Sequence, residues 1–210
     1  DALADLDGNG TRELIASATG GRVYVIEART GAIVWTLPGA VVGAVGAVRL
    51  ADFDGDGNLD LYLAEQGCGR VDSLGDVGRA YSFAANIATP SVLFTLERGR
   101  RDYICGAYDA IGDMDGDGRP EVIAQGSQQF YVYSGVDGRL VSASDSVGFI
   151  PYGRAFLEVA NVDGDPQPEL IAYTDNSFAA PTNSRRVFVM DWDAALGKLV
   201  LRWQRSVPDL

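Results

Sequence analysis

The stretch ADFDGDGNLDLYLA, residues 51–64, places four aspartates within nine positions and continues directly into an apolar segment. Counted from Asp52, the carboxylates fall at positions 1, 3, 5 and 9. Gly55 and Gly57, at positions 4 and 6, allow the backbone to adopt positive φ, so that the odd-numbered side chains can converge. Carboxylates this close repel one another unless a divalent cation lies between them, and Ca²⁺ accepts such an irregular set of oxygens more readily than Mg²⁺. For a single copy, a solvated acidic turn is the alternative, because Asp-Gly pairs are common in hairpins.

The same nine-residue pattern occurs at three other places, and we number the four copies loops 1 to 4 in chain order. Loop 2 is the stretch above, and the others read DLDGNGTRE (5–13), DMDGDGRPE (113–121) and NVDGDPQPE (161–169). Each copy has a carboxyl at position 9 and then an apolar run, which unrelated solvated turns would have no reason to share. The loops are not EF-hands, because they lack a Glu at position 12 and a helical pattern on each side.

The charge of the chain is concentrated in these loops. The chain has 29 acidic and 17 basic residues, a net charge of −12, and the four loops hold 14 of the acids. Outside the loops the charge is therefore close to balanced. This distribution argues against nucleic acid as a partner, which would require a basic face.

The loops begin 47, 61 and 48 residues apart, a spacing that indicates a repeat architecture. In each unit an apolar stretch precedes the loop, a strand pattern follows it, and two further strand patterns rich in β-branched or aromatic residues complete the unit. Four antiparallel strands per repeat predict an all-β fold built of β-propeller blades. We expect one domain, or a fragment of one, and a larger ring with further blades or domains of the same polypeptide is favoured over a closed four-bladed ring. The expected blades span residues 1–39, 40–99, 100–147 and 148–210.

The four D/N-x-D-G-D/N-x-x-x-D/E loops, with Gly-rich approaches such as VVGAVGAV (41–48), resemble the FG-GAP/VCBS repeats of integrin α-subunit-like calcium-binding propellers. The resemblance implies that each loop joins the first and second strands of a blade and that three to four structural Ca²⁺ ions brace one face. It implies ligands at positions 1, 3, 5 and 9 and a carbonyl at position 7. These are Asp5, Asp7, Asn9, Thr11 (carbonyl) and Glu13; Asp52, Asp54, Asp56, Asn58 (carbonyl) and Asp60; Asp113, Asp115, Asp117, Arg119 (carbonyl) and Glu121; and Asn161, Asp163, Asp165, Gln167 (carbonyl) and Glu169.

Loop 4 departs from this pattern at two positions. Pro166 replaces the glycine at position 6 and cannot reach positive φ, and the neutral Asn161 occupies position 1. We therefore expect loops 2 and 3, with four carboxylates each, to bind Ca²⁺ most tightly, loop 1 less tightly and loop 4 least.

In the resembled family, partners usually bind the face opposite the calcium loops. A protein or glycan ligand is expected there, on the long connections of the second and fourth units, because long loops on a rigid scaffold often carry recognition. The alternative is that these connections are variable decoration. The residues proposed for binding are Arg70, Asp72, Asp76, Arg100, Arg101, Tyr103, Phe178, Asn183 and Arg185.

An enzymatic role is not favoured by the sequence. The chain has no histidine, which excludes Ser-His and Cys-His arrangements, and closed calcium loops lack the open position that a catalytic metal needs. Acids outside the loops show no motif and are interpreted as ordinary surface charge: Asp72, Asp76, Asp109, Asp145 and Asp175. Aromatic residues at strand spacing are expected in the cores between blades: Trp35, Tyr133, Phe188 and Trp203.

The remaining signals concern location. Cys68 and Cys105 are an even pair that forms a disulfide if the chain is secreted, with two free thiols as the alternative. No apolar run is long enough to span a membrane. Weak calcium sites fill where calcium is abundant, which favours a secreted or cell-surface location. The leading hypothesis is an extracellular propeller for cell adhesion or ligand recognition; the alternatives are a carbohydrate-active propeller, resembling lectins or polysaccharide lyases, and an architectural spacer.

Overall fold

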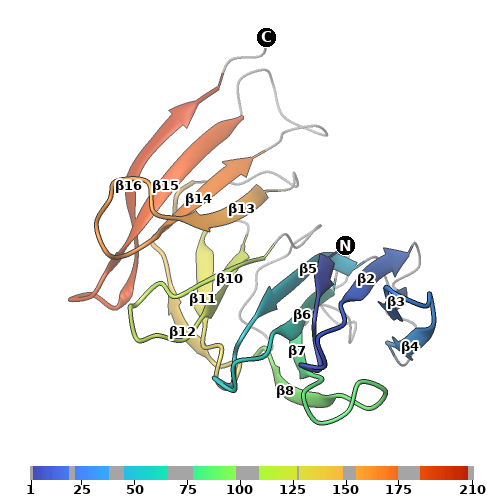
Figure 1. Ribbon diagram of the computed structural model, residues 1–210. Helices are drawn as coiled ribbons and strands as arrows, with labels where there is room; N and C mark the ends of the chain where they lie inside the picture. The colour runs from blue at the N-terminus through green and yellow to red at the C-terminus, as the bar shows by residue number, and fades with distance from the viewer. Residues whose placement is uncertain are drawn as a thin grey trace.

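The computed structural model describes residues 2–18, 22–37, 45–65, 78–97, 109–126, 128–148, 155–174 and 185–207. These residues form sixteen strands and no helix (Figure 1). The strands are β1 (Ala2–Ala4), β2 (Glu13–Ala18), β3 (Arg22–Glu27), β4 (Ile33–Thr36), β5 (Val45–Ala51), β6 (Asp60–Glu65), β7 (Gly78–Ser82), β8 (Ser91–Thr95), β9 (Ala110–Gly112), β10 (Glu121–Gln125), β11 (Phe130–Tyr133), β12 (Leu140–Ala143), β13 (Ala155–Ala160), β14 (Glu169–Thr174), β15 (Arg186–Asp193) and β16 (Lys198–Ser206). The prediction of an all-β fold is confirmed.

Each run of four consecutive strands forms one antiparallel sheet, and neighbours in the sheet are neighbours in the chain. We call the sheets β1–β4, β5–β8, β9–β12 and β13–β16 blades 1 to 4. Short connections of this kind produce a meander, in which every second strand runs in the same direction. The predicted four-stranded units are confirmed.

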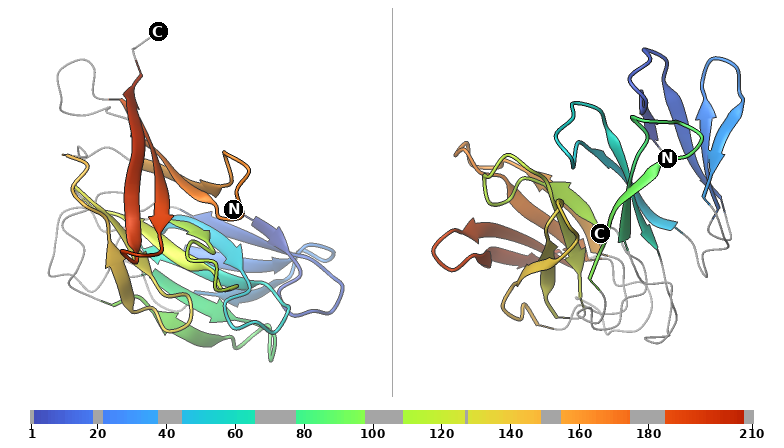
Figure 2. Two further views of the ribbon diagram at one scale, coloured as in Figure 1. Left: turned by 90° about the vertical axis from the view of Figure 1, so that its left-hand side faces the viewer. Right: turned by 90° about the horizontal axis from the view of Figure 1, so that it is seen from below.

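The blades follow one another in chain order along an arc, with blade 1 and blade 4 at its two ends (Figure 2, right). The first strands of successive blades contact one another, β1 with β5, β5 with β9, and β9 with β13. This is the arrangement of propeller blades around an axis. The described residues do not close a ring, so the arc has two outer sheet faces.

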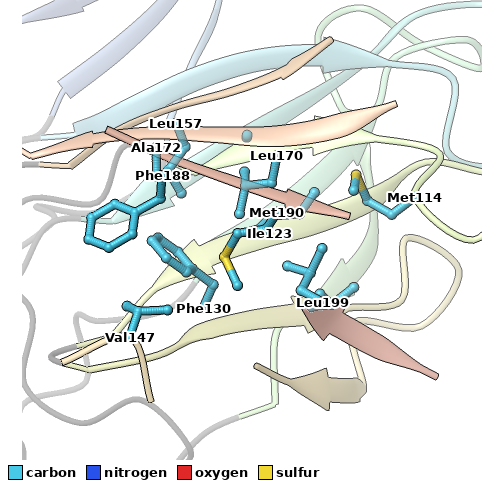
Figure 3. Close-up of a cluster of buried hydrophobic side chains, with 12 residues drawn as sticks. Met114, Ile123, Phe130, Val147, Leu157, Leu170, Ala172, Phe188, Met190 and Leu199 are labelled. Atoms are coloured by element: carbon cyan, nitrogen blue, oxygen red, sulfur yellow. The ribbon is translucent and has the colours of Figure 1, made fainter. Parts of the chain in front are cut away.

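Alternation along each strand sends successive side chains to the two sides of a blade. In β6, Leu61 joins the core shared with blade 1, while Tyr62 joins the core shared with blade 3. The core between blades 3 and 4 contains Met114 and Phe130 of blade 3 and Phe188 of blade 4 (Figure 3). The ring centroids of the two phenylalanines lie 6.2 Å apart. Burial of each large side chain contributes about 1.5–3 kcal/mol, so these cores hold the blades together.

The outer strand of every blade carries a β-bulge against the third strand. The register shifts at Val25/Ile26, Ala80/Tyr81, Val132/Tyr133 and Val189/Met190. One residue of the outer strand is left over at each shift, and the four are Val34, Leu93, Val141 and Arg202. A bulge redirects the side chains around it, so this position can aim a side chain differently from a regular strand.

Two sequence-based assignments are wrong. Trp203 is 40% exposed on the outer face of blade 4, whereas Trp35, Tyr133 and Phe188 are buried between blades as expected. Asp109 is fully buried and accepts a 2.6 Å hydrogen bond from the hydroxyl of Tyr62, so it is not surface charge.

The physical reasons for these corrections are tertiary. Trp203 has strand spacing, but no described blade covers its side of the sheet. Asp109 lies just before β9, where the neighbouring blade supplies a buried hydroxyl. Asp145 is confirmed as a surface acid paired with Lys198, whereas Asp72, Asp76 and Asp175 lie outside the described residues.

Candidate metal loops

All four loops connect the first strand of a blade to the second, as predicted. The glycine at position 4 of every loop has φ between 71° and 86°, in the left-handed region. Gly10, Gly57 and Gly118 at position 6 do the same in loops 1 to 3, with φ between 84° and 89°. These two left-handed residues curl the chain around the acidic side chains, because side-chain-bearing residues rarely adopt that conformation.

The position-1 carboxylate organises the backbone of loops 1 to 3. In loop 3, Asp113 Oδ1 accepts the amide of Gly116 at 2.8 Å and Oδ2 accepts the amide of Gly118 at 2.9 Å. The corresponding bonds to the position-6 amide measure 2.8 Å at Asp5 in loop 1 and 2.9 Å at Asp52 in loop 2. Each loop is therefore preformed around a fixed carboxylate.

The position-9 carboxylate begins the second strand and is buried in every loop. Glu13, Asp60, Glu121 and Glu169 are between 1% and 5% exposed. In loops 1 to 3 one of its oxygens accepts the backbone amide of position 2 at 2.9 Å. The same bond in loop 4 measures 2.7 Å. Each loop thus ends on a carboxylate that the fold holds away from water.

Burial makes the charged form of these carboxylates costly. It raises the pKa of Asp60 to about 6 and that of Glu121 to about 7, although the backbone amides of Phe53 and Met114 act in the opposite direction. Repulsion from Asp54 at Asp60, and from Asp115 at Glu121, raises these pKa values further. Burial also raises the pKa of Glu13. A nearby cation would reverse this effect, since it favours the charged form.

Carboxylate oxygens converge within 4.8 Å of one another in every loop. Positions 1, 3 and 9 form the group in loops 1 to 3, whereas positions 3, 5 and 9 form it in loop 4. The converging residues are Asp5, Asp7 and Glu13; Asp52, Asp54 and Asp60; Asp113, Asp115 and Glu121; and Asp163, Asp165 and Glu169.

The other predicted ligands serve the loop backbone. At position 5, Asn9, Asp56 and Asp117 accept the amide of position 7 at 2.7–2.8 Å. The carbonyls of Thr11, Asn58, Arg119 and Gln167 stay predictions, and the amide of each of these residues donates a hydrogen bond to the position-5 side chain of its loop.

Loops 1 to 3 fit a hard divalent cation. Three carboxylates converge in each, and hard oxygen ligands are those that Ca²⁺ prefers. In loop 2 one carboxylate oxygen is left for a cation. Asp60 Oδ2 accepts the amide of Phe53, whereas Oδ1 is buried and has no hydrogen-bond partner among the described residues. A buried carboxylate oxygen without a partner is costly, and a cation satisfies it.

Loop 4 has a different set of partners. Its position-3 residue, Asp163, accepts a 2.5 Å hydrogen bond at Oδ2 from Arg202 Nη1 of β16. Arg202 also lies 3.6 Å from Asp191 Oδ1 of β15. The backbone amide of Asp165, and then Arg202, lower the pKa of Asp163, whereas burial raises the pKa of Asp115 at the same position of loop 3. A cationic side chain thus already sits among the acids of loop 4.

Adjacent loops lie close together along one edge of the arc. A Cβ on Gly8 of loop 1 would lie 2.8 Å from the Asn58 side chain of loop 2. A Cβ on Gly116 of loop 3 would lie 3.5 Å from the Gln167 side chain of loop 4. The candidate sites therefore form a row and share one edge of the blades.

Of the predicted ligand-binding residues, only Arg185 belongs to the part of the chain that the structure describes. Arg185 directly precedes β15, whose start pairs with Thr174 at the far end of β14 from loop 4. The other eight lie outside the described residues, as do Cys68 and Cys105: Arg70, Asp72, Asp76, Arg100, Arg101, Tyr103, Phe178 and Asn183.

Sequence reasoning missed Arg202 and Asp191 as members of the loop 4 cluster. Arg202 lies 39 residues from Asp163, in a stretch predicted only to be a strand of the fourth unit. The available signal was a comparison of the four outer strands, in which Arg202 is the one charged residue among aliphatic equivalents. That comparison requires the position of the bulge, which the sequence does not reveal.

Comparisons with known proteins agree with this architecture. Residues 5–63, which include loops 1 and 2, match the model of the FG-GAP-like repeat. The chain is similar over 98% of its length to the crystal structure of the V. cholerae biofilm matrix protein Bap1, with a TM-score of 0.62 and 23% sequence identity. It spans 28% of that chain. This likeness shows the fold. No curated protein matches the chain in sequence.

Proposed function

We propose that this chain is a calcium-stabilised, non-enzymatic blade domain of an extracellular protein. The observation that carries the proposal is the convergence of three carboxylates in each of loops 1 to 3, one of them buried. Ca²⁺ supplies positive charge to these carboxylates, and the loops supply its oxygens from fixed backbone positions. The match of residues 5–63 to the FG-GAP-like repeat supports this assignment.

Calcium binding tests this proposal through one residue and a matched control. Asp60→Asn keeps the shape of the buried position-9 side chain but removes its charge, whereas Asp145→Asn changes an exposed acid outside the loops. Calorimetric titration of the metal-free protein should show several Ca²⁺ sites, one of which Asp60→Asn weakens at least about tenfold. The Asp145→Asn variant should bind like the wild type. A chelator that leaves the melting temperature unchanged would contradict the proposal.

We also propose that this chain recognises a protein or glycan partner at the ends of the strands opposite the calcium loops. The integrin-like resemblance supports this edge, and the biofilm matrix setting of the structurally similar protein supports an extracellular location. Our second candidate, a carbohydrate-active domain, predicts cleavage as well as binding. Glycan arrays and immobilised matrix proteins, each probed with and without a chelator, separate these functions. Ligand binding that occurs through the calcium loops and that Arg185→Ala leaves unchanged would contradict the placement of the binding site at the opposite ends of the strands.

The two ends of the arc support further blades of the same polypeptide. Leu3, Leu14, Ile26 and Ile33 pair in register across all four strands of blade 1 and form an apolar row. Leu3, Leu14 and Ile33 are between 40% and 59% exposed. The corresponding faces of blades 2 and 3 are buried against neighbours. An architectural role in a larger ring would use these faces.

Self-association of the isolated chain tests the apolar row. The wild type should associate through its open faces at high concentration, and Leu14→Ser with Ile33→Ser should reduce association without lowering the melting temperature. Sedimentation velocity provides the measurement. A wild type that stays monomeric at high concentration would argue against uncovered docking faces.

A further inference from the structure

Loop 4 keeps the shape of the other loops but reverses the chemistry at position 1. Pro166 has no amide hydrogen, so the bond that fixes the second oxygen of Asp5, Asp52 and Asp113 cannot form there. Asn161 replaces the aspartate: its Oδ1 accepts the amide of Gly164 at 2.7 Å, and its Nδ2 donates to the carbonyl of Asp165. A hydrogen-bond donor therefore stands where loops 1 to 3 present a carboxylate oxygen.

The second change lies on another strand. Arg202 is the bulge residue of β16, and the equivalent residues of the other outer strands are Val34, Leu93 and Val141. Only in blade 4 does the bulge carry a cation, and that cation reaches position 3 of its own loop, Asp163. The loss of the position-1 carboxylate and the gain of the arginine thus occur in the same blade.

The guanidinium of Arg202 also supplies the positive charge that the converging carboxylates of loop 4 require. It lies 2.5 Å from Asp163 Oδ2 and 3.6 Å from Asp191 Oδ1, so it bridges the loop and the third strand. An arginine stays charged at any pH of interest and offers several donors in a fixed plane. It therefore brings a positive charge to one of the three converging carboxylates, Asp163, without any metal.

We propose that Arg202 takes in loop 4 the place that Ca²⁺ takes in loops 1 to 3, so that blade 4 is braced by an internal cation and stays calcium-independent. The calcium part of this contrast rests on the proposed function of loops 1 to 3, whereas the arginine brace does not. The brace predicts that the fourth repeat keeps its loop structure where calcium is scarce.

Matched substitutions at position 3 test the metal count. Asp115→Asn in loop 3 and Asp163→Asn in loop 4 both keep the oxygen that accepts the position-5 amide. Calorimetric Ca²⁺ titration of the full chain should lose one site with Asp115→Asn and none with Asp163→Asn. Loss of a site with Asp163→Asn would overturn the proposal.

A melting experiment tests the brace separately. Arg202→Val installs the residue type found at the bulges of blades 1 and 3, and should lower the melting temperature by about 2 °C, equally in Ca²⁺ and in chelator. Adding Asp163→Asn to Arg202→Val should cause no further loss, because the contact between Arg202 and Asp163 is already absent in the single variant. Strictly additive shifts would overturn the brace.

The two readouts separate the two proposals. If no Ca²⁺ binds to the wild type or to either position-3 variant, the proposal of calcium sites in loops 1 to 3 fails. The melting temperatures of the Arg202→Val and Asp163→Asn variants still show whether Arg202 braces loop 4. A triple variant, Asn161→Asp with Pro166→Gly and Arg202→Val, restores the pattern of the other loops and should gain one Ca²⁺ site. A triple variant that folds, as judged by circular dichroism, and gains none would count against the exchange of one cation for the other.

Discussion

Blades 3 and 4 have the same strand order, the same loop position and the same outer bulge, yet their equivalent residues have opposite surroundings. At position 2 of the loop, Met114 of blade 3 is fully buried, whereas Val162 of blade 4 is 52% exposed. Both residues donate their amide to the position-9 carboxylate, so the local structure is the same. The difference shows that a neighbouring blade, not the repeat itself, decides whether the side chain at a repeated position is buried.

The loops extend this contrast to charge. At position 3 of the loop, burial and repulsion from Asp117 raise the pKa of Asp115 in blade 3, whereas a backbone amide and Arg202 lower the pKa of Asp163 in blade 4. One loop is therefore poorly compensated by the protein alone, and the other is compensated by a side chain.

Truncation at position 2 should separate the blades most clearly. Met114→Ala removes a side chain from the core between blades 3 and 4 and should lower the free energy of unfolding by about 2–5 kcal/mol. Val162→Ala at the same position of blade 4 should change it by less than about 0.5 kcal/mol. Urea denaturation measures both. Equal losses would mean that Val162 is covered in solution.

Because blades 3 and 4 are in close contact at Gly112, a larger residue at this position should destabilise the protein. A Cβ at Gly112 would lie 2.4 Å from Cγ1 of Val159 in blade 4, and valine has little freedom to move away. Gly112→Ala should therefore cost about 1–3 kcal/mol. At the equivalent position of blade 4, Ala160→Gly should cost about 0.5–1 kcal/mol, through chain entropy alone. A neutral Gly112→Ala variant in urea denaturation would show that the blades separate easily.

The pH dependence should have opposite signs in the two loops. Because the pKa of Glu121 is raised from 4.5 to about 7, the folded chelated protein binds more protons than the unfolded chain in this range. Its stability should fall as the pH rises from about 4.5 to 7, on the order of 1 kcal/mol, and Glu121→Gln should flatten this slope. The contribution of Asp163, whose pKa is lowered, is present above its ordinary value of 3.8 and is lost as the pH falls below it.

Thermal melts across this pH range, with chelator and with Ca²⁺, provide the measurement. With Ca²⁺ the slope between pH 4.5 and 7 should reverse, because protons compete with the metal for the carboxylates. An Asp145→Asn control should follow the wild type at every pH. A chelated protein that gains stability toward pH 7 would contradict the role of Glu121.

Moving the arginine to blade 3 should have the smallest effect on stability. Val141 is 45% exposed, so Val141→Arg should change the free energy of unfolding by less than about 0.5 kcal/mol. It places a cation at the bulge beside loop 3 and should weaken Ca²⁺ binding there, measured by calorimetry. Unchanged affinity would show that the bulge alone does not aim the side chain at the loop.

Much of the fold followed from local patterns. Period-2 alternation and turn glycines predicted the strands, and the repeated acidic loop predicted their grouping by four, because both depend on residues a few positions apart. The convergence of Asp52, Asp54 and Asp60 was also readable, since the spacing of carboxylates and glycines determines a loop of this size. Trp203 and Asp109 were misassigned, because burial at those positions depends on another blade.

The shape of each loop, the order of the strands and the two-sided pattern of every blade could be read from the residues alone, because backbone conformation and alternation are local properties. The tertiary structure alone decided which copies of a repeated position are covered, and it brought Arg202 to Asp163 across 39 residues. That meeting depends on a bulge in the outer strand and on the fold of the whole blade. Equivalent positions in a repeat thus share their geometry, while their energies depend on what lies beside them.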